Sequence, residues 1–180
     1  MRTRTAIVTA STAMQGDFDL QALYEALDAR WCERKMSWSA VAREVSGSRI
    51  KPGPASTISK LRERRIAEGD GVLQMLLWLG RTPESFVNGH MDADSDCFRL
   101  PEVTGPQVLR WDTPALFLAL NTQRLERQLT WTQVAREVGG YTPAMLAHLG
   151  KGGRVGFPPV MRLVRWLGRP AASFTRISEW

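Results

Sequence analysis

The chain contains one short segment twice, and this internal repeat restricts its fold more than any other feature. Ser37 to Gly47 read S-W-S-A-V-A-R-E-V-S-G, and Thr130 to Gly140, 93 positions later, read T-W-T-Q-V-A-R-E-V-G-G. A return of this kind indicates an internal duplication. We therefore expect the chain to hold two copies of one folding unit.

Each repeated segment is predicted to be a short helix. Ser37 and Thr130 are favourable N-cap residues, and Gln133 completes a capping box with Thr130. Gly47 and Gly140 are expected to end the two helices, because glycine is the residue most often found just beyond a helix C-terminus.

A second short pattern follows each repeated segment. It reads P-A-S-T-I-S-K-L over residues 54–61 and T-P-A-M-L-A-H-L over residues 142–149. Two apolar residues three positions apart are expected to face inward in each pattern, namely Ile58 and Leu61, and Leu146 and Leu149. A helix, a glycine turn and a second helix exposed on one side form the helix-turn-helix plan, whose second helix enters the DNA major groove.

The order L-T/S-x-x-x-V-A-x-x-V-G resembles the Cro/phage-repressor (Xre-like) helix-turn-helix family, particularly its short regulators with L-x-x-L-G-x-x-x-x-x-F endings. Each copy also contains the sequence Trp-Leu-Gly-Arg, at 78–81 and 166–169. The resemblance covers nearly the whole chain outside the first sixteen residues and the middle linker. It implies an all-α protein made of two tandem five-helix, lambda-repressor-like helix-turn-helix domains. The expected parts are a loose tail over 1–16, copy one over 17–88, an acidic Pro/Gly linker over 89–111 and copy two over 112–180.

Helical periodicity and turn residues predict the ends of each copy. Asp17 or Asp19 is expected to cap the first helix of copy one, and Thr113 is expected to cap that of copy two. Last short helices should end at Ser85-Phe86 and Ser173-Phe174. The acidic run of the linker, Asp92 to Asp96, is expected to be solvated loop, since it lacks the ligand spacing of a calcium loop.

Charge favours a polyanionic partner. The net charge is +6 with a pI near 10.0, and arginine outnumbers lysine by far, which suits phosphate and base-edge contacts. GC-rich coding is the alternative explanation of the arginine content. Cys32 and Cys97 have neither zinc nor disulfide spacing, which fits a reducing cytoplasm, and no apolar run is long enough to cross a membrane.

The resemblance also implies which residues meet DNA. The first, second and sixth residues of the recognition helix contact base edges in that family, which places Ala55, Ser56 and Lys60 in copy one and Pro143, Ala144 and His148 in copy two. The further candidates for DNA contact are Arg49, Lys51, Thr57, Ser59, Arg62, Arg64, Arg65, Ser39, Thr132, Thr142, Lys151 and Arg154. Copy one concentrates the cations, so we expect it to dominate recognition.

Two repeated pairs have alternative roles. Trp38 and Trp131 stand where the family commonly has a glutamine that bonds a phosphate, and packing on the preceding helix is the favoured role of both indoles. Arg43 and Arg136 could contact phosphates or pair with a carboxylate such as Glu33 or Glu126.

No arrangement of residues that would support catalysis is found, so an enzyme is not expected and no cofactor is implied. The sequence predicts a cytoplasmic, sequence-specific regulator of transcription that binds double-stranded DNA, most simply a repressor. The alternative is a protein-interaction module with the same fold, such as an antitoxin, in which a second protein chain is the partner.

Overall fold

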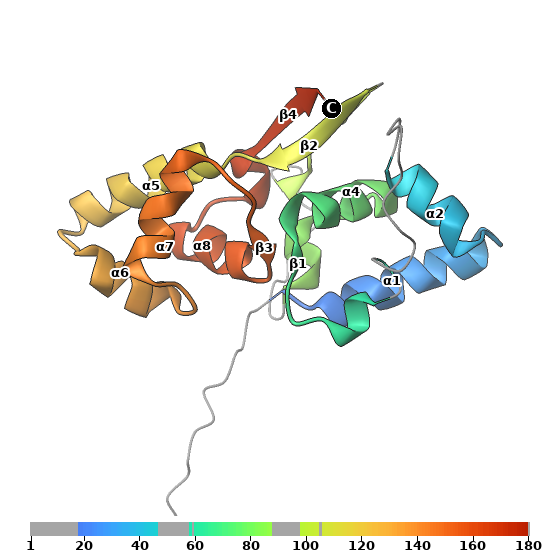
Figure 1. The fold of residues 1–180 in the computed structure, drawn as a ribbon, viewed down its shortest axis with the longest axis horizontal. Helices are drawn as coiled ribbons and strands as arrows, with labels where there is room; N and C mark the ends of the chain where they lie inside the picture. Colours follow the sequence, from blue (N-terminus) through green and yellow to red (C-terminus); the bar gives the residue numbers. More distant parts are fainter. Residues whose placement is uncertain (1–17, 47–57, 59, 88–97, 105, 180) are drawn as a thin grey trace, which may run out of the picture.

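The computed structural model of the protein describes residues 18–46, 58, 60–87, 98–104 and 106–179, and it contains both helices and strands (Figure 1). The elements of copy one are α1 (Leu20–Glu33), α2 (Trp38–Val45), η1 (Leu61–Glu63), β1 (Ala67–Glu68), α4 (Gly69–Leu79) and η2 (Pro83–Phe86), where η marks a 3₁₀ helix. Those that follow are β2 (Gln107–Trp111), α5 (Thr113–Glu126), α6 (Trp131–Val138), α7 (Pro143–His148), η4 (Leu149–Lys151), β3 (Gly156–Phe157), α8 (Pro159–Leu167), η5 (Ala171–Phe174) and β4 (Thr175–Glu179).

The prediction of an all-α fold made of two tandem domains is wrong, because two antiparallel sheets of two strands each accompany the helices and the β1–β3 sheet joins the copies. β1 pairs with β3, and β2 pairs with β4 from Gln107↔Glu179 to Trp111↔Thr175. Both sheets join segments far apart in the sequence. Strands of two and five residues carry too little alternation of polar and apolar residues to be recognised from the chain alone.

The repeated helices begin as predicted. The Ser37 hydroxyl accepts a hydrogen bond from the Ala40 amide at 3.2 Å. Thr130 and Gln133 form the reciprocal capping box, with the Thr130 amide donating to the Gln133 side chain at 2.7 Å. α6 ends one residue earlier than expected, since Gly139 is its C-cap.

In each copy, an equivalent backbone hydrogen bond joins the two ends of the copy. The Asp19 amide donates to the Phe86 carbonyl at 2.7 Å, and the Asp112 amide donates to the Phe174 carbonyl at 2.8 Å. The side chains of Asp19 and Asp112 also cap α1 and α5, so the prediction of Thr113 as a cap is wrong by one position. A carboxylate at residue 112 competes successfully with the neighbouring hydroxyl for the free amides of the first turn.

A local twofold axis relates the two copies. Trp78 and Trp166 hold the same place in the Trp-Leu-Gly-Arg sequences, 88 positions apart, and Glu68 and Gly156 are also 88 positions apart. Glu68 and Gly156 are Cα partners in the antiparallel β1–β3 pair. A strand that pairs antiparallel with its own counterpart places a twofold axis between the copies, and Figure 1 shows α1 and α2 on the opposite side from α5 and α6.

Polar contacts and a continuous core hold the copies together. The Gln74 side chain donates to the Leu109 carbonyl at 2.8 Å, the Trp111 amide donates to Asp70 at 3.0 Å, and the Ala171 amide donates to Glu84 at 2.7 Å. The buried apolar residues of both copies form one cluster. We call the surfaces joined by β1, β3, α4 and β2 the inter-copy interface.

The stretch expected to be a linker, 89–111, supplies part of this interface. β2 lies within it, and Val108, Leu109 and Trp111 are buried against α4 and β4. Its glycines, prolines and acids suggest a loop, but its last five residues bury enough apolar surface to be ordered. The acidic run Asp92 to Asp96 lies outside the described residues.

Candidate nucleic-acid interface

In the second half of the chain, a tight turn joins the short helices α6 and α7. α6 ends at Val138, and Gly139 and Gly140 both have positive φ values, 71° and 74°. Glycine adopts this left-handed region without the steric cost that a Cβ brings, so the chain turns sharply there. Thr142 then caps α7 through the Met145 amide at 3.2 Å, with Pro143 in the first turn.

α7 is buried on one side only, as the sequence predicts. Leu146 is fully buried and Leu149 is 8% exposed. The exposed side chains of the α7 segment are Thr142, Pro143, Ala144, Met145, Ala147 and His148. This side of the helix is therefore free to contact a partner.

Copy one has the corresponding inward-facing residues, since Ile58 and Leu61 are 3% and 1% exposed. Lys60, Arg64 and Arg65 are exposed around them. The predicted contact residues Arg49, Lys51, Ala55, Ser56, Thr57 and Ser59 lie outside the described residues, as does the side chain of Arg62.

Cations flank α7 without lying on it. Lys151 and Arg154 follow the helix and Arg136 lies on α6, and all three side chains are exposed. Arg43 and Arg136 form no ion pair with Glu33 or Glu126 in the described part of the chain. Ser39 and Thr132, in the first turns of α2 and α6, are also exposed.

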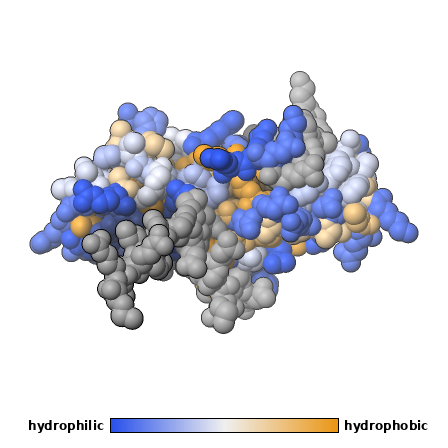
Figure 2. All heavy atoms as spheres, turned by 90° about the horizontal axis from the view of Figure 1, so that it is seen from below, coloured by the Kyte–Doolittle hydropathy of each residue, from blue (hydrophilic) through white to orange (hydrophobic). Residues whose placement is uncertain are grey.

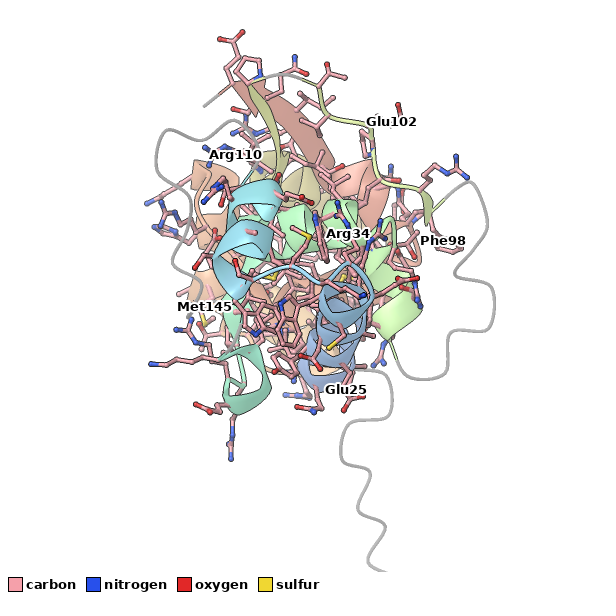
Figure 3. All side chains as sticks on the ribbon, turned by 90° about the vertical axis from the view of Figure 1, so that its right-hand side faces the viewer. Glu25, Arg34, Phe98, Glu102, Arg110 and Met145 are labelled. Carbon is pink, nitrogen blue, oxygen red and sulfur yellow. The ribbon has the colours of Figure 1, made fainter. Side chains whose placement is uncertain are left out.

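The described parts of the two predicted contact regions, η1 in copy one and α7 in copy two, lie toward the same side of the molecule. In Figure 3, Met145 of α7 and the teal ribbon of η1 lie to the left, whereas Phe98 and Glu102 lie to the right. From below, Figure 2 shows hydrophilic side chains toward both ends of the molecule and hydrophobic ones near its middle. A single partner surface could therefore reach both copies.

The repeated tryptophans pack on the preceding helix, as favoured. Trp38 stacks on Trp31 of α1, with ring centroids 4.9 Å apart, and Trp131 stacks on Phe117 of α5 at 5.5 Å. Both indoles are half-buried. Their packing positions α2 and α6 against the helices before them.

A repeated Arg–Glu–Trp cluster also positions these helices, and the sequence analysis missed it. Glu44 accepts from Trp78 at 2.9 Å and from Arg34 at 2.7 Å. In the second cluster, Glu137 accepts from Trp166 and Arg127, both at 2.8 Å. All three residue types recur in both copies, and this recurrence was visible in the sequence. The contacts could not be predicted from it because they join separate helices.

These clusters predict a dependence of stability on pH. The indole hydrogen bond, followed by the arginine, lowers the pKa of Glu44 and of Glu137 below the ordinary value of 4.5. A carboxyl whose pKa is lower in the folded state stabilises that state above pH 4.5 and loses this contribution as pH falls through the folded-state pKa. In the experiment, the melting temperature is measured from pH 6 down to pH 3, and that of the wild type should fall. We expect this fall to be smaller in Glu44→Gln and in Glu137→Gln. Glu126→Gln, at an exposed site on α5, is the control and should follow the wild type.

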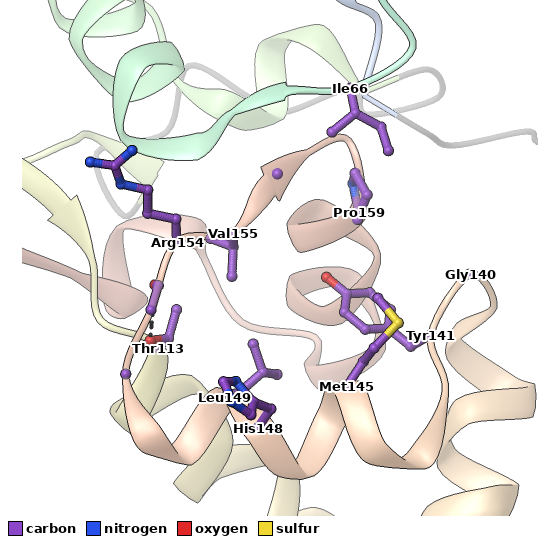
Figure 4. A pocket seen from close by; sticks show the side chains of 13 residues that line it. Ile66, Thr113, Gly140, Tyr141, Met145, His148, Leu149, Arg154, Val155 and Pro159 are labelled. Carbon is purple, nitrogen blue, oxygen red and sulfur yellow. Dashed lines mark hydrogen bonds between the residues drawn. The ribbon is translucent and has the colours of Figure 1, made fainter.

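A hollow of about 380 Å³ lies beside α7, between this helix and the inter-copy interface (Figure 4). Its walls include Tyr141, Met145, Val155 and Pro159, and Ile66 reaches it from copy one. Ile66 and Met145 are 59% and 49% exposed. Burial raises the pKa of the Tyr141 hydroxyl above its usual range, with the positive charge of Arg162 opposing the shift.

The described residues give little support to metal binding or to a membrane-spanning role. They contain no cluster of three or more His, Cys, Asp or Glu side chains arranged to hold a metal ion. No helix in the same ranges combines the length and apolar composition needed to span a bilayer.

The chain matches no known family profile, no curated protein and no solved structure.

Proposed function

We propose that the protein is a sequence-specific regulator of transcription that binds double-stranded DNA through two diverged helix-turn-helix units, in the manner of a repressor. The observation that carries the proposal is the geometry of α6, the Gly139-Gly140 turn and α7, whose exposed side chains project from a firmly packed helix. A helix presented in this way fits the DNA major groove.

The charges support a nucleic acid as the partner. The net charge of +6 would be attracted to phosphates, and exposed cations accompany both predicted recognition segments, residues 54–61 and 142–149. Phosphate contacts would fix the register of the protein on the duplex, and the recognition segments would supply sequence preference.

The local twofold axis supports a specific mode of binding. Repressor-like proteins commonly bind DNA as dimers, and here one chain holds two units in a dimer-like arrangement. The exposed residues of the units differ, with Lys60 in copy one and His148 at the equivalent position of copy two. One chain would therefore cover two unlike half-sites.

Three alanine variants test the proposal and the expected dominance of copy one. Lys60→Ala should weaken binding and relax preference at one base pair, because a base-edge contact contributes roughly 1–3 kcal/mol of discrimination. Arg64→Ala should weaken binding to all sequences alike, and His148→Ala should have the smallest effect. The affinities are measured at fixed salt on a selected site and on a scrambled duplex. A silent Lys60→Ala together with a damaging His148→Ala would assign recognition to copy two.

The hollow beside α7 favours one alternative, a protein-interaction module such as an antitoxin. Apolar side chains exposed at Ile66 and Met145 are suited to a protein side chain. Stable, stoichiometric co-purification with a neighbour-encoded protein, without salt-dependent binding to duplex DNA, would support this alternative over the regulator.

A further inference from the structure

The exposed side of α7 lacks the side chains that most often read three of the four bases. Guanine is read mainly by Arg or Lys, adenine by Asn or Gln and cytosine by Asp or Glu. None of these residue types occurs between Thr142 and Gly150. A Thr hydroxyl can contact either type of base, and small apolar side chains contact the C5 methyl group of thymine. Thr142 lies at the start of α7, so the apolar contact is the one open to most of its exposed surface.

The positions of the alanines fit such a contact. Ala144 and Ala147 are exposed, whereas Leu146 and Leu149 are buried. With 3.6 residues per turn, Ala144 and Ala147 project from the side opposite the two leucines. Their short side chains let the helix backbone approach a flat surface closely, and Met145 adds an exposed apolar group at the flank.

The charges around α7 complement this neutral surface. Arg136 on α6 and Lys151 and Arg154 just after α7 are exposed, and none of the three belongs to α7 itself. Duplex DNA has the same arrangement, since anionic backbones border the uncharged base edges of the major groove. An apolar protein partner would not account for the three flanking cations.

We propose that α7 recognises the C5 methyl groups of thymines, with Ala144 and Ala147 as the specificity-determining residues and Thr142 and His148 as polar side chains beside them. The proposal rests on the DNA-binding function proposed above. It makes the half-site of copy two thymine-rich, whereas the exposed Lys60 of copy one suits guanine.

Deoxyuridine tests the proposal because it differs from thymidine only by the C5 methyl group. The full chain is titrated with a selected duplex in which deoxyuridine replaces thymidine in one half-site at a time. The half-site of copy two is the one whose base preferences persist in Lys60→Ala. Each contacted methyl lost there should weaken binding about fourfold, which corresponds to the ~0.8 kcal/mol of one buried CH₂ group. Replacement in the other half-site should have a smaller effect.

Matched variants connect the methyl groups to α7. Ala144→Asn should abolish the effect of deoxyuridine at one position, and Ala147→Asn should do so at another. Ala29→Asn makes the same change at an exposed site on α1 and should leave the effect unchanged. Circular dichroism shows whether each variant is folded.

The outcomes separate this proposal from the proposed function. Sequence-specific binding that is indifferent to deoxyuridine in both half-sites would overturn methyl recognition and leave DNA binding intact. A deoxyuridine effect that persists in folded Ala144→Asn and Ala147→Asn would overturn the assignment to α7. Failure to bind any duplex would overturn the proposed function itself.

Discussion

Binding to duplex DNA is expected to weaken by about 10²- to 10⁴-fold when the salt concentration rises from about 50 to 200 mM. Each phosphate neutralised by a cation releases condensed counterions, and roughly four to eight such contacts give a log–log slope of about −4 to −7. Lys60, Arg64, Arg65, Lys151 and Arg154 are the described cations nearest the two recognition segments. Fluorescence anisotropy of a labelled duplex across a salt series measures the slope.

Single variants measure how much individual cations contribute to this slope. Arg64→Ala and Lys151→Ala should each reduce its magnitude by about one. Arg99→Ala removes an exposed charge next to Phe98, on the other side of the molecule in Figure 3, and should leave the slope unchanged. A flat salt response of the wild type would contradict the nucleic-acid interface.

Gly69→Ala is expected to disrupt the inter-copy interface. A Cβ at Gly69 would lie 2.5 Å from the Val155 carbonyl oxygen and 2.9 Å from the Trp111 ring. The Gly69 amide also donates to that carbonyl at 2.7 Å, so backbone cannot move away without breaking the bond. We expect a loss of unfolding free energy at or above the upper end of the roughly 1–3 kcal/mol typical of overpacking.

Gly71→Ala is the matched control, because it lies two residues further along α4. A Cβ there would meet only the flexible end of Glu68, at 3.2 Å. The same glycine-to-alanine change should therefore be neutral, or stabilise the helix by up to about 1 kcal/mol. Urea denaturation of the two variants and the wild type measures the difference. Equal stability of Gly69→Ala and Gly71→Ala would mean that the copies do not approach as closely as described.

The local features of the repeat were the ones that the sequence could predict. Capping hydrogen bonds reach only three residues along the chain, so capping rules suffice to identify Ser37, Thr130 and Gln133. Ile58, Leu61, Leu146 and Leu149 follow from helical spacing, and all four are buried. The packing of Trp38 and Trp131 on the preceding helix, which the sequence favours, is also confirmed.

The features that the sequence could not predict depend on contacts between distant segments. β1 and β3 consist of two residues each, and they become strands only because the copies meet there. The glycine, proline and acidic residues that precede β2 predict a linker there, whereas Leu109 is buried and its carbonyl accepts a hydrogen bond from Gln74 of α4. The hydrogen bonds of the Arg–Glu–Trp clusters join residues up to 34 positions apart, beyond the reach of rules based on spacing.

Selection of bound sequences from a random pool of duplex DNA, followed by the mass of the resulting complex, tests the central claim most directly. The local twofold axis and the unlike recognition segments predict enrichment of two different half-sites at a fixed separation. They also predict a complex of one chain per duplex. No enriched sequence, or a perfect palindrome bound by two chains, would contradict the account.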